Sequence, residues 1–391
     1  MSNPSNNSSR VYLDYAATTP VDPRVLECML PYFEAIFGNT SSVHTFGQQA
    51  EAALDEARGI LAQGLNCTPT EVIFTSCGSE SDNLALRGAA FSARKLRNAD
   101  HILISPLEHP AVIRTAQQLA SLNGFEVEYL PVDELGQVHP QDVAARLRPT
   151  TAVVSVMYSN NEIGTINPIH EIGALCRDQG VPFHTDAVQA AAYLPVNVEE
   201  LNVDMLSLGA HKFYGPKGVG ALYIRQGTPI LSVLTGGGQE FGLRAGTHNT
   251  PYIVGMAEAF RLAQTEREAR QAHVKPMRDH IIAHVLESIP DSRLTGHPEV
   301  RLHNHASFAF KDVDGNALIM MLDMEGYACS SGSACKTGDP KPSEVLTEIG
   351  LSPDWAFGSL RVTLGSGVSP DNVESFVKIL PEVVERARAL A

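Results

Sequence analysis

Short apolar runs alternate with longer amphipathic stretches from about residue 50 to residue 225. The apolar runs predict strands at 71–76, 101–106, 125–132, 151–159, 181–187, 203–209 and 219–225. The run at 151–159 is almost continuously apolar, as expected of a strand buried on both faces. Helical patterns, such as that of 168–180, lie between the runs. This alternation predicts an α/β domain with a mostly parallel central sheet sandwiched by helices. Such sheets bind ligands at the carboxyl ends of their strands.

The pattern changes in the last third of the chain. Residues 252–290 read as long helices, and residues 300–391 form a second α/β stretch with the strands HASFAF and SLRVTL and a closing helix. We therefore expect a large domain of residues 19–265. A smaller α/β domain would combine residues 1–18 with 266–391 and would carry a cysteine loop.

Composition limits the classes of function. The chain has 391 residues and a formal charge of −15, from 29 basic and 44 acidic residues. Such an acidic protein is not expected to bind nucleic acid through phosphate contacts. The N-terminus, MSNPSNNSSR, lacks the apolar core of a signal peptide, and no apolar run approaches the roughly 18 residues of a membrane helix. These features predict a cytoplasmic protein without a membrane segment.

The six cysteines form no CxxC pair, which gives no support for a zinc ribbon, and we expect no metal site. Cys335 stands beside Lys336 in a loop of small residues, ACSSGSACKTGD. Such a loop exposes a thiol, and a neighbouring cation favours the thiolate. The alternative is a surface loop with an incidental cysteine.

The first polar cluster after a predicted strand is TSCGSESDN at 75–83. Gly78 permits a tight turn, and a helix beginning near Ser79 would direct its N–H groups at a phosphate. The alternative is a serine N-cap with Glu80 in a capping box. The nucleotide-binding fingerprints GxGxxG and GxxxxGK[ST] are absent from this segment.

Two further residues follow strands. Asp186 ends the run at 181–187, where a carboxylate suits a protonated pyridine nitrogen, although it also suits a helix N-cap. Lys212 follows the run at 203–209 among small residues. Most lysines are solvated, but an amine held in a cleft has a lowered pKa and forms Schiff bases. Together with Cys335, these clusters indicate pyridoxal 5′-phosphate (PLP) and a nucleophilic thiol.

Many ordered motifs carry a family resemblance that runs from about Val11 to the last helix. They are YLDYAATTPVDPRV, FGNTSSVHTFG, EVIFTSCGSESDNLAL, NNEIG, HTDAVQ, HKFYGPKGVGALY, GGGQEFGLRAGT, SSGSACKTG and SLRVTLG. The chain resembles the cysteine desulfurases of the NifS/IscS type, within the class-V aminotransferase group of PLP-dependent transferases of fold type I.

The resemblance implies catalytic and substrate-binding roles. Lys212 would hold the cofactor as a Schiff base, and His109 would stack on the cofactor ring and relay protons. Arg361 would bind the substrate carboxylate, with Asn39 nearby. Cys335 would accept the sulfur.

The resemblance also implies cofactor contacts. These are Gly78, Ser79 and His211 to the phosphate, Asn161 and Gln189 near the ring hydroxyl, and Asp186 to the ring nitrogen. Thr247 would reach the phosphate of the neighbouring protomer, which implies a homodimer with shared sites.

Three positions depart from the family pattern. Gly209 stands where many relatives have a serine that binds the phosphate, and residues 236–240 read GGGQE where relatives often have GGGHE. Cys329 precedes Cys335 by six residues, where relatives carry a small or apolar residue. It either packs or resolves a persulfide into a disulfide, and packing is the more common role of such a thiol.

The predicted activity is conversion of L-cysteine to L-alanine, with sulfur held on Cys335 as a persulfide. The acceptor would be a protein such as an iron–sulfur scaffold, while tRNA thiolation and nitrogenase supply stay open. A selenocysteine or cystine lyase, or an epimerase, is an alternative on the same fold. A non-catalytic partner-binding scaffold is an alternative of another class.

Overall fold

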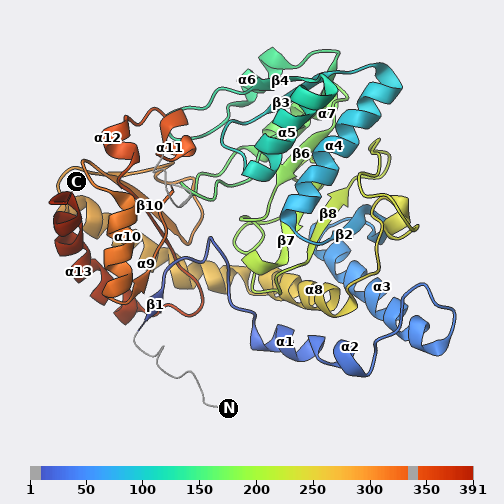
Figure 1. The fold of residues 1–391 in the computed structure, drawn as a ribbon, viewed down its shortest axis with the longest axis horizontal. Coiled ribbons are helices and arrows are strands. Elements are labelled where there is room, and N and C mark those ends of the chain that lie inside the picture. The colour runs from blue at the N-terminus through green and yellow to red at the C-terminus, as the bar shows by residue number, and fades with distance from the viewer. Residues whose placement is uncertain (1–9, 333–341, 391) are drawn as a thin grey trace.

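The computed structural model describes residues 10–332 and 342–390 (Figure 1). The N-terminal lead and Cys335 lie outside the described residues. Among the described residues there are three sheets, of seven, three and two strands. None of the helices in these two ranges is long and apolar enough to cross a bilayer.

The largest sheet has the strand order β2-β8-β7-β6-β5-β3-β4. Its strands are β2 (Val72–Thr75), β3 (His101–Ile104), β4 (Glu126–Tyr129), β5 (Thr151–Ser155), β6 (Phe183–Asp186), β7 (Met205–Gly209) and β8 (Gly220–Ile224). Every strand lies within a predicted run. β8 is antiparallel to β2 and β7, and the other pairs are parallel, which confirms the mostly parallel sheet. The carboxyl ends of β2, β3, β5, β6 and β7 therefore meet at one edge.

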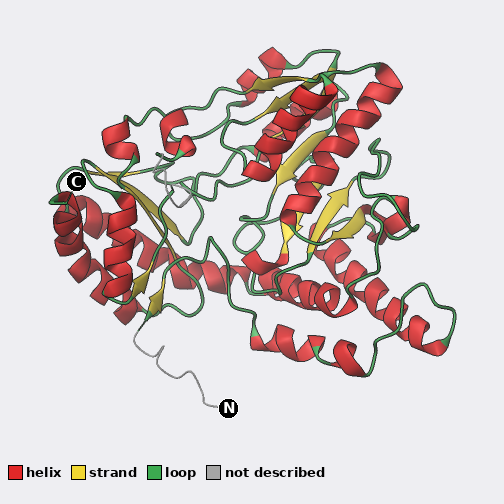
Figure 2. Cartoon of the chain, in the orientation of Figure 1, coloured by secondary structure: helices red, strands yellow, loops and turns green. Residues whose placement is uncertain are grey.

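Helices cover both faces of this sheet (Figure 2). They are α3 (Thr45–Leu65), α4 (Gly78–Arg97), α5 (Pro110–Asn123), α6 (Pro140–Arg146), α7 (Ile169–Asp178) and α8 (Thr250–Thr265). Alternate strand residues enter two separate cores, as the pleat requires. The core under α4 and α5 contains Ile73, Ile102, Val153, Met205 and Leu222. The core under α3, α7 and α8 contains Phe74, Leu103, Val154, Leu206 and Tyr223.

Shorter helices connect these elements. They are α1 (Pro23–Met29), α2 (Pro31–Glu34), and the 3₁₀ turns η1 (Pro69–Glu71), η2 (Ala210–Lys212) and η3 (Glu240–Gly242). α1 and α2 lie along α8 and α3 at the end of the molecule away from the C-terminus (Figure 1).

The C-terminal part confirms the second α/β stretch. Its elements are α9 (Arg267–Ser288), β9 (Ser292–Leu294), β10 (His305–Phe310), α10 (Gly315–Met324), β11 (Tyr327–Ala328), α11 (Glu344–Glu348), α12 (Pro353–Ala356), β12 (Ser359–Thr363) and α13 (Pro370–Arg388). β9, β10 and β12 form an antiparallel sheet. A capping box of Ser369 and Asn372 begins α13.

The N-terminal segment connects the two C-terminal sheets to the carboxyl edge of the seven-stranded sheet. β1 (Val11–Tyr12) pairs in parallel with β11, and the Ala16 N–H donates to Thr363 Oγ1 of β12 at 2.9 Å. The Thr19 N–H then donates to the His211 carbonyl at 2.9 Å. Residues 11–19 therefore run from the C-terminal sheets to η2, at the carboxyl edge of the large sheet.

Candidate active site

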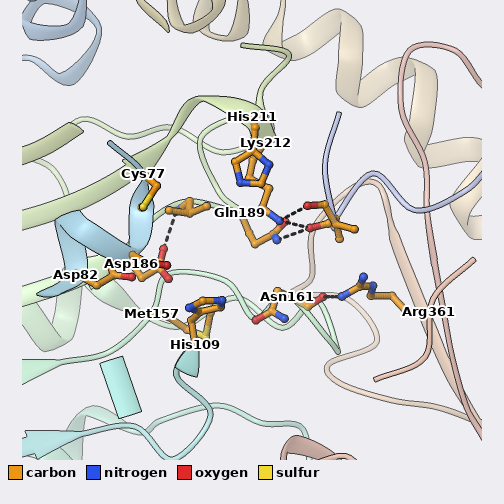
Figure 3. Close-up of a pocket in the computed structure, with 15 residues that line it drawn as sticks. Cys77, Asp82, His109, Met157, Asn161, Asp186, Gln189, His211, Lys212 and Arg361 are labelled. Atoms are coloured by element: carbon orange, nitrogen blue, oxygen red, sulfur yellow. Dashed lines mark hydrogen bonds between the residues drawn. The ribbon is translucent and has the colours of Figure 1, made fainter. Parts of the chain in front are cut away.

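A cavity of about 320 Å³ lies at the carboxyl edge of the seven-stranded sheet. Predicted site residues line much of it: Gly78, Ser79, His109, Asn161, Asp186, Gln189, His211, Lys212 and Arg361 (Figure 3). The sequence did not indicate the other lining residues, Ala16, Ala17, Cys77, Asp82, Met157 and Val188. These residues come from distant segments of the chain and meet where the parallel strands end, which is where such sheets bind ligands.

The start of α4 forms one wall of the cavity. Its N-cap is Cys77, and no side chain caps the helix. The alternative of a serine N-cap is therefore wrong, and Glu80 accepts from the Ser76 N–H at 2.8 Å and pairs with Arg244 at 2.7 Å. A Cβ on Gly78 would lie 2.7 Å from Val188 Cγ2, so this close approach requires glycine. The first turn of α4 thus leaves room and N–H groups for an anion.

His211 and Gly209 lie on the same side of the cavity. His211 Nδ1 is 3.1 Å from Thr18 Oγ1. Burial, followed by the charges of Lys212 and Lys217, lowers the pKa of His211 to about 4, so the ring is neutral. A Cβ on Gly209 would lie 3.4 Å from Val188 Cγ1, an ordinary contact. Space alone therefore does not explain why glycine replaces the serine of many relatives.

Asp186 ends β6 and is 5 % exposed. Its Oδ1 accepts from the Val188 N–H at 2.8 Å, and no α-helix follows, so the helix N-cap alternative is wrong. Burial raises the pKa of Asp186, while His109, the Val188 N–H and Lys212 lower it. A buried carboxylate with basic neighbours suits a cationic ring nitrogen.

His109 lies beside Asp186 at the cavity wall (Figure 3). It is the N-cap of α5, and its Nδ1 accepts from the Ala111 N–H at 3.1 Å. This bond fixes the ring and places the proton of the neutral form on Nε2. Burial lowers the pKa of His109, which favours that neutral form.

Lys212 extends from η2 to the N-terminal segment. Its Nζ donates to the carbonyls of Ala16 at 2.5 Å and Ala17 at 2.7 Å. Gln189 Nε2 donates to the same Ala16 carbonyl at 2.9 Å. Burial, followed by the charge of Arg361, lowers the pKa of Lys212 to about 8. Lys212 is therefore a far better nucleophile at neutral pH than a solvated lysine.

Arg361, on β12, is 7 % exposed. It donates to Asp14 Oδ1 at 2.8 Å and to the Asn161 carbonyl at 3.0 Å. Its buried Nε has no hydrogen-bond partner. A guanidinium with an unpaired N–H suits a carboxylate ligand. The sequence did not indicate Asp14, which is 347 residues from Arg361.

Asn39 and Thr247 do not line the cavity. Both are exposed, and the Asn39 side chain accepts from the Ser41 N–H at 2.9 Å. Neighbouring residues connect their segments, because Thr40 Oγ1 is 2.7 Å from His248 Nδ1. Within one chain, Asn39 is therefore not among the residues that line the cavity with Arg361.

Cys329 packs against the main core. Burial, followed by the charge of Asp14, raises the pKa of its thiol, while Arg361 opposes this effect. A protonated, half-buried thiol that contacts the core is a packing group, in agreement with the more common of the two roles considered. Cys335 lies outside the described residues.

The donor groups fit pyridoxal 5′-phosphate. The start of α4 suits its phosphate, the amine of Lys212 its aldehyde, and the carboxylate of Asp186 its ring nitrogen. A second buried carboxylate oxygen, Asp82 Oδ1, has no hydrogen-bond partner at the cavity wall. Arg361 adds a place for the carboxylate of an amino acid.

Comparison with known proteins agrees with this geometry. The family model described as aminotransferase class-V matches residues 11–376. A relative named cysteine desulfurase IscS from Dictyoglomus turgidum is 44 % identical, over 97 % of this chain and 96 % of its own. The protein of the same name from Methanosarcina thermophila is 43 % identical, over 100 % of this chain and 95 % of its own.

Solved structures give the same result. One described as a NifS-like protein is 35 % identical and superposes with a TM-score of 0.89, over 96 % of this chain and all of the other. Another, described as SspA in complex with cysteine, is 36 % identical with a TM-score of 0.80, over 90 % of this chain and 98 % of the other.

Proposed function

Because this chain belongs to the class-V aminotransferase family and is a PLP-dependent cysteine desulfurase, we propose that the cavity described above binds the cofactor and L-cysteine together. The observation that carries this proposal is the convergence of an amine, a carboxylate and a guanidinium in one cavity of about 320 Å³. The names of the curated relatives argue against the alternative of a non-catalytic scaffold.

We propose that Lys212 holds the cofactor covalently and that Asp186 pairs with its ring nitrogen. His109 would stack on the ring, with Asn161 and Gln189 at the ring hydroxyl. The phosphate would lie at Gly78, Ser79 and His211. The bound cofactor supplies an electron sink for the charge that develops at the substrate Cα.

Different residues of this chain would carry out the successive steps of the reaction. Arg361 orients L-cysteine by its carboxylate, and Lys212, once released, removes the Cα proton. The thiolate of Cys335 attacks the substrate sulfur, so that a new S–S bond forms while the S–Cβ bond breaks. The remaining three-carbon fragment takes up one proton at Cβ and regains one at Cα, so that it leaves as L-alanine, and the sulfur stays on Cys335 as a persulfide.

The test is to add L-cysteine to the holoenzyme without a reducing thiol and to measure alanine and persulfide together. About one persulfide per chain on Cys335, and continued alanine release after a thiol is added, supports the assignment. C335A should lose both products, whereas C28A, which removes a half-buried thiol beside α8, serves as the matched control. A persulfide on Cys77 or undiminished turnover by C335A contradicts the assignment of the nucleophile.

We propose a homodimer in which Asn39 and Thr247 complete the partner's site. Both are exposed and lie outside the cavity of their own chain. Nearby apolar side chains are each more than half exposed: Leu26, Leu30, Phe33, Phe37, Val43, Phe46 and Phe241. Such a concentration of exposed apolar groups is typical of a surface that a second copy covers. F37E should produce monomers in sedimentation experiments, and a wild-type chain that sediments as a monomer contradicts the proposal.

We also propose that the persulfide passes to an acceptor protein, such as an iron–sulfur scaffold, in the cytoplasm. The division into residues 19–265 and residues 1–18 with 266–391 is proposed as the domain arrangement. Transfer of ³⁵S from L-cysteine to a purified acceptor tests the first proposal. If no iron–sulfur scaffold protein accepts ³⁵S while a tRNA-thiolation protein does, the sulfur belongs to another pathway.

A further inference from the structure

A row of buried polar side chains crosses the middle of the seven-stranded sheet, on the face covered by α4 and α5. Ser155 on β5, His184 on β6 and Ser207 on β7 are each fully buried. His184 Nδ1 is 2.9 Å from Ser155 Oγ, and His184 Nε2 is 2.9 Å from Ser207 Oγ. Burial lowers the pKa of His184 to about 3, so the ring is neutral. Apolar residues of the same face, such as Val153, Met205 and Leu222, flank the row.

One carboxyl group lies beside Ser155, at one end of the row, and another lies beside His184. Glu108, which precedes α5, is 3 % exposed, and its Oε2 lies 3.4 Å from Ser155 Oγ. Its Oε1 accepts from the Met157 N–H at 2.5 Å. Asp82, on α4, is 1 % exposed, and its Oδ1 lies 3.6 Å from His184 Nε2 without a hydrogen-bond partner.

Asp186 is the third buried carboxyl of this group. Burial, and then the charge of Asp186, raises the pKa of Glu108 to about 8 and the pKa of Asp82 well above its usual value. Burial raises the pKa of Asp186 itself, but this carboxyl has two basic neighbours, His109 and Lys212, and the Val188 N–H, which oppose the effect of burial. The titratable groups around the row are Cys77 and Asp82 of α4, Glu108 and His109 before α5, His184 and Asp186 of β6, and Lys212 of η2. Three adjacent buried carboxyls cannot all be ionised.

We propose that Glu108 and Asp82 are proton-holding positioning residues, which confine a single negative charge to Asp186 through the row of Ser155, His184 and Ser207. This proposal rests on the proposed pairing of Asp186 with the ring nitrogen of the cofactor. One negative charge among the three carboxyls matches the one positive charge of the ring nitrogen. The protons on Glu108 and Asp82 remove the repulsion that these carboxylates would otherwise exert on the carboxylate of Asp186. Glu108 does not line the cavity and Asp82 lines it together with Asp186, and the proposal assigns both an effect on the charge of Asp186 rather than a contact with the substrate.

The first experiment measures the thermal midpoint of the cofactor-free protein from pH 5 to pH 9. A carboxyl whose pKa is higher in the folded state than in the unfolded state reduces stability as the pH rises from its unfolded value towards its folded value. Glutamine lacks this effect. The midpoint of E108Q minus that of wild type should therefore rise by roughly 2–5 °C between pH 5 and pH 8 and then level off.

A matched control has the opposite sign. Hydrogen bonds from Arg244 and Ser76 lower the pKa of Glu80 against the effect of burial, so E80Q should lose stability relative to wild type as the pH rises from the acid range. D82N is the second variant and should behave like E108Q. A midpoint difference for both E108Q and D82N that is constant from pH 5 to pH 9 overturns the proposal.

The second experiment records the absorption spectrum of the bound cofactor. Glutamine resembles protonated glutamate, so E108Q and wild type should have the same spectrum at pH 6. At pH 9 their spectra should differ, because Glu108 of wild type has then lost its proton beside Asp186. A spectral difference at pH 6 overturns the proposal. If instead D186N leaves the spectrum unchanged, the pairing of Asp186 with the ring is wrong, while the pH dependence of E108Q in the cofactor-free protein still reports the proton on Glu108.

Discussion

The pH at which Lys212 captures its cofactor can be predicted from its surroundings. A solvated lysine with a pKa near 10.4 is only about 0.04 % unprotonated at pH 7. Burial and the charge of Arg361 lower the pKa of Lys212 to about 8, while Asp14 and Asp186 oppose them. The reactive fraction is then about 9 % at pH 7 and about 91 % at pH 9, roughly 200-fold above a solvated lysine at pH 7. The rate of covalent capture should therefore rise about tenfold from pH 7 to pH 9 and then level off.

Rapid mixing of cofactor-free protein with pyridoxal phosphate, followed by absorbance, measures this rate between pH 6.5 and pH 10. Nα-acetyl-lysine in the same buffers corrects for titration of the cofactor itself, and K212R should show no covalent phase. D14N should move the midpoint to lower pH, because Asp14 raises the pKa of Lys212. A rate that increases tenfold per pH unit up to pH 10 would refute the reasoning.

Three further predictions follow from specific contacts. R361K should raise the KM for L-cysteine by about 10–100-fold with a smaller effect on kcat, because an ammonium cannot bind a carboxylate through two parallel N–H groups; an unchanged KM contradicts the clamp. K212A and T247A should each bind the cofactor weakly alone, but a random equal mixture of the two chains should regain about a quarter of the wild-type sites in an absorbance titration. Half of the dimers are then mixed, and each mixed dimer has one intact site of two. No recovery would contradict a site that is shared between protomers. The buried Arg58 guanidinium lies 2.7 Å from the Glu240 carboxylate, and E240Q leaves it without a charged partner. E240Q should therefore reduce the free energy of unfolding, measured in urea, by about 3 kcal/mol, and a reduction below about 1 kcal/mol contradicts a structural role for this pair.

Sequence patterns predicted the strands because each buried strand is a short apolar run. They also predicted where the site residues collect, since polar residues such as Asp186 and Lys212 directly follow such runs. The order of the strands was not predictable, because alternation alone does not specify which strands become neighbours. The short strands β1, β9 and β11 have two or three residues each, too few to show a period.

The site residues that were missed differ in the signal they left. Asp14 approaches Arg361 only through the folded chain, and nothing local marks it. Asp82 did leave a signal, because it occupies the buried side of α4 together with Ala85, Leu86 and Ala89. An acid at an apolar position of an amphipathic helix is costly to bury and therefore deserves a functional explanation. Asn39 was predicted from its motif alone, and a motif does not specify whether its residue lines the cavity of its own chain; in this chain Asn39 does not.

The path of the N-terminal segment has a consequence for biosynthesis. Residues 11–17 leave the ribosome long before their partners Tyr327 and Thr363. A contact between residues 347 apart cannot form until the later residue has emerged, by which time the seven strands between residues 72 and 224 have already left the ribosome. The contacts of Ala16 and Ala17 with Lys212 need only residues of the large sheet, whereas the bonds of the same segment to β11 and β12 need strands that emerge later. A nascent chain stalled before β12 therefore has an N-terminal segment that is held at His211 through Thr19 but lacks its bond to Thr363.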